Sequence, residues 1–145
     1  MLSLVFLFAT MTMTPDATLD AWHKAAAAAD EKAYFDAMAP EFIFLGTDAT
    51  ERWDIASFRE FAHPYFAKGK AWTFVPRDRH VIVQGDVAWF DEKLDSASYG
   101  ECRGSGVLRR IDGQWKVAHY NLTIPIPNDL AKKVVKMIRE QKPAS

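Results

Sequence analysis

The second half of the chain alternates apolar and polar residues in long runs separated by short turn sequences. These runs fill residues 72–127 and are divided at "QGD", "DSASYG" and "DG". Alternation with a period of two places successive side chains on opposite faces of a strand, and short turns join neighbouring strands in antiparallel order. The pattern therefore predicts an antiparallel meander, one face of which has to be covered by the rest of the chain.

The first half of the chain shows helical spacing instead. Leu19, Trp22 and Ala26 lie on one face of a first expected helix, and Asp30 is placed to cap a second one. A short strand, "EFIFLG", comes next and is followed by a third helix that begins after Asp54. Helices followed by a curved antiparallel sheet predict an α+β fold in which the helices cover one sheet face.

The composition is that of one globular domain without a basic surface. The 145 residues are 49% hydrophobic and 26% charged, which is typical of a single domain with a single core. Eighteen Lys and Arg against nineteen Asp and Glu give a net charge of -1, so we expect no nucleic-acid partner. The single cysteine, Cys102, excludes an intramolecular disulfide and a multi-cysteine metal site.

Residues 1–14, "MLSLVFLFATMTMT", form an apolar run that is too short to span a bilayer, which takes about 20 residues. Its length suits a secretory signal, although a basic start and a clear cleavage site are missing. A disordered or packed tail is the alternative. A signal would send the protein to the periplasm or out of the cell, and without one it would be cytoplasmic. In both cases residues 15–145 are expected to form a single domain.

The last strand of the meander raises the question of which side chains point inward. The Asp-Gly turn at 112–113 sets the pairing by counting, and this count puts Gly106 opposite His119 and Gly104 opposite Asn121. The other face of this strand is more polar near the turn, so the expected inward set is Trp115, Val117, His119 and Asn121. Polar side chains opposite glycines indicate space for a ligand beside them.

The strand "DVAWFDEKLD" adds a carboxylate to this cavity. If Asp91 pairs with Arg103 on the outside, Glu92 points inward, whereas a slip of one residue would turn it outward. A buried carboxylate has a raised pKa and can exchange a proton with a carbon acid. Glu92 is therefore the expected base, with His119 as acid/base partner and Asn121 as oxyanion donor. The alternatives are a rim charge, a satisfied core histidine and a structural amide.

Four stretches of the chain resemble a known family. They are "FLGTDATERW", "HPYFAKGKAW", "AWFDEKLD" and "RGSGVLRRIDGQWKVAHYNLTIPIPN". Together with the helix-first order, they resemble the SnoaL-like branch of the nuclear transport factor 2-like superfamily over residues 18–135. The resemblance implies a cone-shaped α+β fold with an enclosed pocket, often dimeric through the outer sheet face. Members include polyketide cyclases, ketosteroid isomerase-like enzymes, dehydratases and a kinase association domain, so the fold leaves the function open.

We expect a pocket for a small apolar or aromatic molecule. Its lining should be the aromatic set Trp22, Phe44, Trp53, Phe66, Trp72 and Phe90, with Asp48 at the mouth. Ketosteroid isomerases carry a carboxylate base near the position of Asp48, but the local motif differs here and the role is not transferred. An enzyme of this kind would catalyse a cofactor-independent isomerisation, cyclisation or dehydration by proton transfer. The alternative is a non-catalytic ligand-binding or association module.

The four histidines give no sign of a metal site. His23 and His63 are expected to be structural, and the histidines lack the HxH and HExxH spacings of metal ligands. Neither a metal nor an organic cofactor is therefore expected.

The outer face of the meander predicts assembly. With His119 inside, the apolar side chains of Trp89, Tyr120, Leu122 and Ile124 would project from the uncovered face, and such a patch is typical of an interface. We expect a homodimer joined sheet to sheet. Alternatively, the amphipathic helix expected from Asn128 onward folds back over this patch and leaves a monomer.

Overall fold

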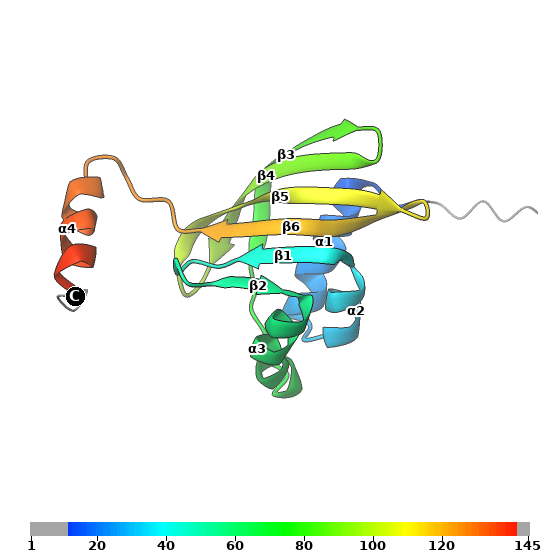
Figure 1. Ribbon diagram of the computed structural model, residues 1–145, viewed down its shortest axis with the longest axis horizontal. Coiled ribbons are helices and arrows are strands. Elements are labelled where there is room, and N and C mark those ends of the chain that lie inside the picture. Colours follow the sequence, from blue (N-terminus) through cyan, green and yellow to red (C-terminus); the bar gives the residue numbers. More distant parts are fainter. Residues whose placement is uncertain (1–11, 142–145) are drawn as a thin grey trace, which may run out of the picture.

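The computed structural model describes residues 12–141, in which helices precede the long strands as predicted (Figure 1). The elements in chain order are α1 (Pro15–Ala27), α2 (Glu31–Asp36), β1 (Met38–Leu45), β2 (Arg52–Asp54), α3 (Ile55–Ala67), β3 (Val75–Gln84), β4 (Val87–Ser96), β5 (Gly100–Ile111), β6 (Gln114–Thr123) and α4 (Ala131–Gln141). The apolar run expected to be a signal or a tail lies largely outside the described residues. Within residues 12–141, no helix is long and apolar enough to cross a membrane.

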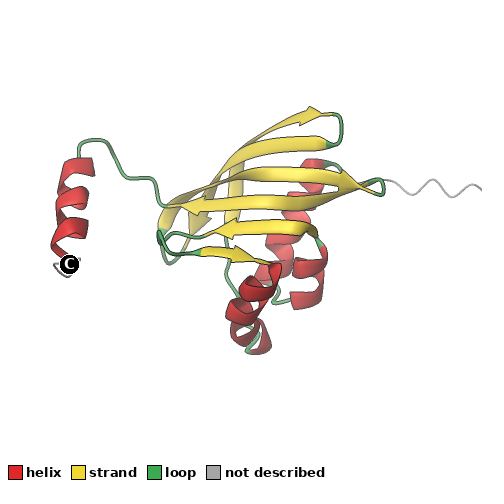
Figure 2. Cartoon of the chain, in the orientation of Figure 1, coloured by secondary structure: helices red, strands yellow, loops and turns green. Residues whose placement is uncertain are grey.

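Six strands form one curved sheet in the order β2-β1-β6-β5-β4-β3. The strands β3 to β6 pair antiparallel with their neighbours in the chain, which confirms the predicted meander, and β1 joins β6 in parallel. The helices α1, α2 and α3 cover one face of the sheet (Figure 2). The predicted α+β fold is thus confirmed, and we call the helix-covered side the inner face.

Local sequence explains where two of the helices begin. The carboxylate of Asp30 accepts a hydrogen bond from the backbone N–H of Ala33 at 3.0 Å, and that of Asp54 accepts one from Ser57 at 2.9 Å. Each cap satisfies a backbone N–H that has no partner inside its own helix. Both aspartates occupy the predicted positions.

The helices and the inner face enclose one apolar core. Trp22 from α1 and Phe58 from α3 belong to the same buried cluster as Leu94, Leu108 and Val117 from three strands. Each of these five side chains is at most 2% exposed. Burial of this apolar surface is the main force that holds the helices on the sheet.

The β5–β6 hairpin follows the predicted register near its turn. Asp112 and Gly113 both have positive φ, at 50° and 76°, as a two-residue turn of type I′ requires. The pairs that follow, as far as Leu108 with Val117, are the predicted ones.

A β-bulge at Ala118 then interrupts the alternation. The pair after Leu108 and Val117 is Val107 with His119, so Ala118 is an extra residue on β6. Val117 and Ala118 are both buried, whereas neighbours in a regular strand point to opposite faces. Every side chain of β6 beyond the bulge therefore lies on the face opposite to the one that counting predicts.

The bulge overturns part of the predicted site. His119 and Asn121 lie on the outer face, so the prediction that they border a cavity is wrong. Tyr120 and Leu122 point inward instead and are 2% and 7% exposed. Gly106 shows the local cause, because a Cβ at this position would overlap the backbone carbonyl oxygen of His119. A glycine here lets the bulged strand approach closely.

A second bulge lies in β3 at Asp78, whose φ is +47°. Two residues, Asp78 and Arg79, stand opposite the single residue Glu92 of β4. A regular strand would turn Asp78 toward the inner face, and the extra residue turns Arg79 inward in its place.

Glu92 points inward as predicted, although its pairing differs from the expected one. It stands opposite Gly104, and Lys93 rather than Asp91 pairs with Arg103. This shift by two residues preserves the face, since side chains alternate with a period of two. Glu92 is 1% exposed.

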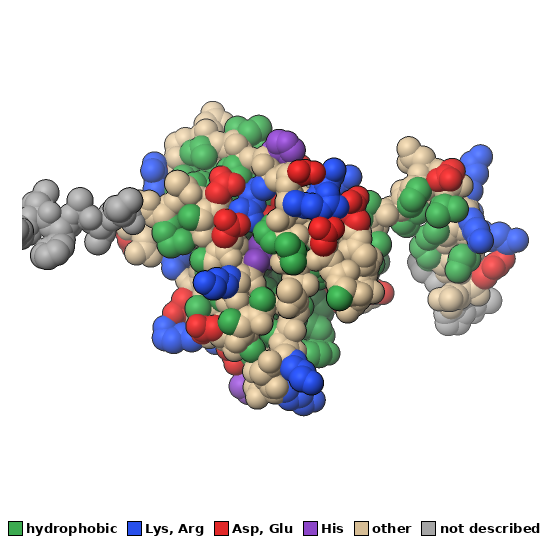
Figure 3. Space-filling model, turned by 180° about the vertical axis from the view of Figure 1, so that it is seen from behind, with side chains coloured by type: hydrophobic (Ala, Val, Ile, Leu, Met, Phe, Trp, Pro, Cys, Tyr) green, Lys and Arg blue, Asp and Glu red, His purple; other side chains and the backbone are tan. Residues whose placement is uncertain are grey.

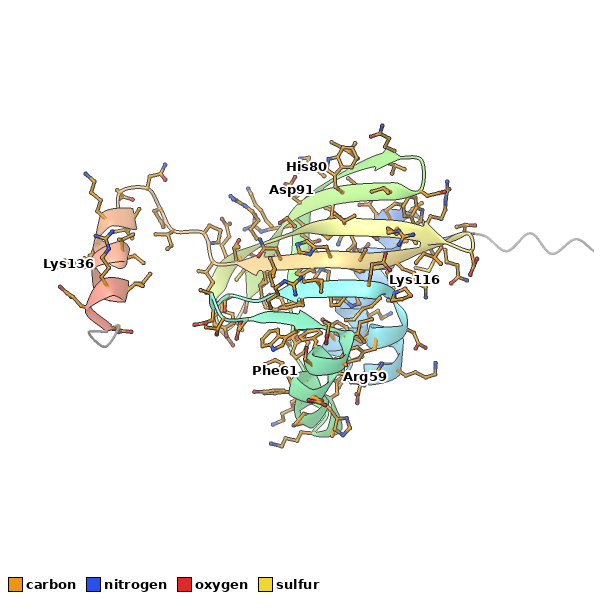
Figure 4. The ribbon with its side chains drawn as sticks, in the orientation of Figure 1. Arg59, Phe61, His80, Asp91, Lys116 and Lys136 are labelled. Carbon is orange, nitrogen blue, oxygen red and sulfur yellow. The ribbon has the colours of Figure 1, made fainter. Side chains whose placement is uncertain are left out.

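The outer face of the sheet carries one row of mainly apolar side chains, one from each of five neighbouring strands. The row, in order from β3, is Ile82, Trp89, Val107, His119 and Ile43. Charged side chains such as His80 and Asp91 lie on the same face (Figure 4). Four residues form the predicted dimer patch. Trp89 and Ile124 are exposed, at 42% each, whereas Tyr120 and Leu122 are buried.

The helix α4 stands apart from the body, beyond the end of the sheet at which β1 and β6 finish (Figure 1). It begins at Ala131, after a turn that starts near Asn128. The predicted helix therefore forms, but in this structure it does not fold back over the sheet.

Candidate functional site

A cavity of about 160 Å³ opens between the helices and the inner face, near the ends of β1 and β6. Its lining is mainly aromatic, and the residues are Trp22, His23, Tyr34, Phe44, Gly46, Thr47, Glu51, Trp53, Phe58, Phe61, Trp72, Phe74, Tyr99, Tyr120 and Leu122. These residues come from all three body helices and from several strands and loops. The cavity is thus a product of the tertiary fold.

Stacked rings form the walls of this cavity. The rings of Phe44 and Phe58 lie 4.5 Å apart and nearly parallel, and those of Trp22 and Tyr34 lie 5.0 Å apart at 8°. Tyr120 meets Trp22 edge to face at 4.8 Å. Packed aromatic pairs of this kind are rigid and offer large apolar surfaces to a ligand.

The predicted aromatic lining divides into two groups. Trp22, Phe44, Trp53 and Trp72 line the cavity. Phe66 and Phe90 are both 4% exposed and belong to the core, outside the cavity lining.

Asp48 lies in the loop between β1 and β2 and not in the cavity lining. Its carboxylate accepts hydrogen bonds from the backbone N–H and the hydroxyl of Thr50, at 2.8 Å and 2.6 Å. An aspartate that bonds the backbone two residues on is typical of a turn. Its loop neighbours Thr47 and Glu51 do line the cavity, so the loop as a whole forms part of the mouth.

Glu92 is the centre of a buried polar network directly behind the cavity wall. One carboxylate oxygen, Oε1, lies 2.6 Å from Nε2 of His23 and accepts a hydrogen bond from the Tyr120 hydroxyl at 3.0 Å. The other oxygen, Oε2, accepts one from Nε of Arg79 at 2.7 Å. The side chain of Glu92 is 0% exposed, and its contacts with the cavity run through His23 and Tyr120.

Arg79 links this network to α1. Its Nη1 donates hydrogen bonds to the carboxylate of Asp20 at 2.7 Å and to the backbone oxygen of Asp16 at 3.0 Å. The guanidinium therefore joins β3, β4 and α1, and it supplies a positive charge beside the buried carboxylate. A buried charge that is paired and hydrogen-bonded is tolerated, whereas an isolated one is costly.

The charge state of the network follows from these contacts. Burial acts to raise the pKa of Glu92, but the hydrogen bonds from His23 and Arg79 and the positive charge of Arg79 outweigh it, so the pKa lies below its ordinary value. The sequence-based expectation of a raised pKa is therefore wrong. Burial and the neighbouring carboxylate of Glu92 raise the pKa of Tyr120 well above its ordinary value. Glu92 is thus ionised and Tyr120 protonated near neutral pH.

Gly104 makes room for this arrangement. A Cβ at Gly104 would overlap the hydroxyl of Tyr120 and would lie 3.1 Å from Oε1 of Glu92. The glycines of "RGSG" thus mark the site, as the sequence indicated, but they accommodate Tyr120 and the bulged backbone and not the side chains of His119 and Asn121.

Three members of the network were missed or misassigned from the sequence. The sequence predicts a structural role for His23 and an outward position for Tyr120, and it gives no signal for Arg79. The bulges at Ala118 and Asp78 explain the errors at Tyr120 and Arg79. Beyond each bulge, the side chains that point inward are not the ones that a regular strand would turn inward.

The described residues offer no evident metal site. Within residues 12–141, no three His, Cys, Asp or Glu side chains gather in a way that could hold a metal ion.

Known structures share this architecture. A proposed dehydratase of the NTF2-like family from Streptomyces avermitilis superposes with a TM-score of 0.65 at 16% identity, covering 79% of this chain and 100% of that one. A proposed ketosteroid isomerase from Parabacteroides distasonis superposes with a TM-score of 0.60 at 20% identity, covering 82% of this chain and 94% of that one. A proposed calcium/calmodulin dependent protein kinase II association domain from Xanthomonas campestris superposes with a TM-score of 0.58 at 20% identity, covering 78% of this chain and 86% of that one. Identities this low show a common fold and leave the activity open.

The sequence itself shows the family. Among proteins of curated function, none matches this sequence significantly. Residues 16–127 match the sequence model of the SnoaL-like domain, which covers most of the chain and agrees with the resemblance seen in its motifs. The chain therefore belongs to the SnoaL-like domain family.

Proposed function

We propose that the protein binds a small, largely apolar ring compound in the aromatic cavity and transfers a proton on it, with His23 as the group that exchanges the proton. The observation that carries this proposal is the position of His23, which lines the cavity and lies 2.6 Å from the buried carboxylate of Glu92. A histidine held by a carboxylate is a common acid/base arrangement.

The ionised carboxylate decides the tautomer of His23. A carboxylate only accepts hydrogen bonds, so Nε2 of His23 carries the hydrogen that it donates to Glu92. The neutral ring then has its free electron pair on Nδ1, which can take a proton from a ligand carbon next to a carbonyl. Return of that proton to another ligand atom completes an isomerisation, and transfer to a leaving hydroxyl completes a dehydration.

In this proposal Glu92 is a positioning residue and not the base that the sequence suggested. Its side chain is fully buried and its pKa is lowered, which makes it a poor proton acceptor near neutral pH. Its carboxylate instead orients the imidazole ring of His23 through the hydrogen bond at Nε2, while Arg79 and Tyr120 hold the carboxylate in place.

The size of the cavity supports a compact ligand. A dry cavity of about 150 Å³ in another protein encloses benzene, and the volume here is about 160 Å³. One ring would be enclosed, and a larger ligand would have to extend through the mouth. We propose one-ring or fused two-ring carbonyl compounds as the substrate class, without a bound cofactor.

The proposal is tested with a matched pair of histidines. His23 pairs with Glu92 inside, and His63 pairs with Glu31 on the surface at 2.9 Å. Ligands found by thermal shift in a panel of cyclic ketones, aromatic acids and steroids are assayed for turnover by the wild type, His23→Gln and His63→Gln. We expect His23→Gln to lose at least about 100-fold in kcat and His63→Gln to keep wild-type activity. Equal activity of the two variants would contradict the role of His23.

A non-catalytic ligand-binding protein is the second candidate, and the aromatic character of the cavity lining favours it. Such a protein would bind members of the same panel without turnover, and His23→Gln would change the affinity by less than about 10-fold. We also propose that the protein functions as a homodimer, which leaves an association module as a third use of the fold.

A further inference from the structure

The helix α4 exposes an apolar stripe along its whole length. The structure describes every residue of α4, and none of them is buried. Its apolar side chains recur at helical spacing on one side, and they are Leu130 at the start, then Val134, Val135, Met137 and Ile138. In Figure 3, α4 stands apart from the body and presents hydrophobic side chains to the surroundings.

A helix of this length needs a surface to pack against. Isolated helices shorter than about 12 residues are marginal in water, and α4 spans 11 residues. Its ion pair between Lys136 and Glu140, at 3.7 Å, is exposed and contributes little. The missing stabilisation has to come from burial of the apolar stripe.

The linker keeps α4 away from its own body. Pro125 and Pro127 lie between the end of β6 and the start of α4 in a segment without regular structure. Prolines stiffen a linker into an extended spacer, so the position of α4 beyond the sheet end follows from local sequence (Figure 1). This arrangement favours a second copy as the source of the packing surface.

The surface that matches α4 lies at the same end of the molecule. Leu122, one residue before the end of β6, lines the cavity, so the linker to α4 starts beside the cavity. The lining residues Phe61 and Tyr99 are 42% and 52% exposed, although both are large apolar side chains. Figure 4 labels Phe61 on α3. Exposed apolar side chains that gather at one place mark an interaction surface.

The helix α4 and the rest of the chain have net charges of opposite sign. The helix α4 carries Lys132, Lys133, Lys136 and Arg139 against the single acidic residue Glu140. The chain as a whole has a net charge of -1, so the remainder of the chain is net acidic. The mouth itself includes the carboxylate of Glu51, and that of Asp48 lies in the same loop. This complementarity favours docking of α4 on the body of another copy.

We propose that α4 of one copy covers the cavity mouth of a second copy, and that the exchange is reciprocal. Because α4 and the mouth lie at the same end, one two-fold axis brings each helix to the mouth of the other copy and closes the assembly as a dimer. The apolar stripe then forms the missing wall of the cavity, so each site is completed by its partner. This inference specifies the surface of the proposed dimer and is independent of the proposed chemistry.

The first test measures mass by sedimentation for three proteins. They are the wild type, Ile138→Glu on the apolar stripe and Lys132→Gln on the polar side, and both substitutions change the net charge by one negative unit. We expect a dimeric wild type and a rise of at least about 30-fold in the dimer dissociation constant for Ile138→Glu. Lys132→Gln removes one of four exposed basic charges of α4 and should raise this constant by less than about 3-fold. A monomeric wild type, or equal dimerisation by all three proteins, would overturn the proposal.

The second test identifies the surface on which α4 docks. Phe61 at the mouth and Trp89 on the outer sheet face are both 42% exposed. We expect Phe61→Glu to weaken the dimer as Ile138→Glu does, and Trp89→Glu to leave it intact. The reverse result would place the contact on the outer face of the sheet and refute docking at the mouth.

The third test separates two copies from one. Tyr99→Cys and Ile138→Cys proteins, each made separately, are mixed and oxidised, since the native Cys102 is buried. A cross-linked species of twice the mass that forms only in the mixture supports the exchange. A double variant that cross-links within one chain would identify α4 as a lid on its own cavity and refute the proposal. A monomer that binds anionic phosphatidylglycerol vesicles through Ile138 would assign α4 to a lipid surface and also refute it.

Discussion

Two histidine–glutamate pairs in this protein have similar geometry and different surroundings. Nε2 of His23 lies 2.6 Å from Glu92, and Nδ1 of His63 lies 2.9 Å from Glu31. The side chains of the first pair are 8% and 0% exposed, and those of the second are 64% and 24% exposed. Water screens the second pair and not the first. The comparison shows that environment, and not residue type, separates a candidate site from an ordinary surface contact.

The two pairs also differ in their further partners. Glu92 receives additional hydrogen bonds from Arg79 and Tyr120, at 2.7 Å and 3.0 Å. Glu31 has Arg59 nearby at 3.9 Å, at the limit of an ion pair. Glu92 thus fixes several elements at once, whereas Glu31 joins the start of α2 to α3 at the surface.

The largest expected difference between the pairs is in folding stability. Glu92→Gln removes the charge that compensates buried Arg79, and breaking a buried ion pair costs about 3 kcal/mol or more. Glu31→Gln affects a solvated pair and should cost less than about 1 kcal/mol. Urea denaturation of both variants measures these free energies of unfolding. Equal costs would show that burial does not distinguish the pairs.

A smaller effect is expected from crowding the buried pair without changing its charges. Gly104→Ala introduces a Cβ that overlaps the Tyr120 hydroxyl and should displace it from Glu92. Overpacking of this kind costs about 1–3 kcal/mol. Thermal unfolding of Gly104→Ala and Tyr120→Phe, singly and combined, tests the idea. If the two single costs simply add in the double variant, the hydroxyl is not what the new methyl group meets.

The pH dependence of stability should sharpen the comparison further. The pKa of Glu92 is lowered in the folded state from an ordinary value of 4.5. Its stabilising contribution is therefore complete above that value and is lost as the pH falls through the folded pKa. The wild type should therefore be more stable than Glu92→Gln at neutral pH. We expect the difference between their free energies of unfolding to narrow as the pH falls below about 4.5. A difference that stays constant from pH 7 to pH 3 would contradict an ionised Glu92.

The smallest effect is expected at the exposed histidine. His63→Gln removes the surface contact with Glu31, and the expected change in the free energy of unfolding is below about 0.5 kcal/mol. Ligand affinity and turnover should stay at wild-type values. A marked loss of either would mean that the surface pair communicates with the cavity, whose lining includes neither His63 nor Glu31.

Much of the architecture was predictable because it depends on local sequence. Asp30 and Asp54 cap helices through contacts with residues three positions ahead, and the Asp-Gly turn at 112–113 sets the first pairs of its hairpin. The predicted face of Glu92 is correct, although the predicted pairing of its strand differs by two residues from the observed one. Errors by an even number leave a strand's faces unchanged, so the alternating pattern tolerates them.

The sequence by itself thus determined the order of elements and the α+β class and favoured an inward Glu92, since short-range hydrogen bonds and hydrophobic periodicity carry this information. Its motifs, and not its periodicity, showed the family. Only the tertiary structure decided which polar side chains meet that carboxylate. One extra residue at Ala118 exchanged His119 for Tyr120, and one at Asp78 brought in Arg79. A bulge is selected by the fit of a curved sheet to its covering helices and to the glycines of the next strand, and these contacts join residues that are far apart in the chain.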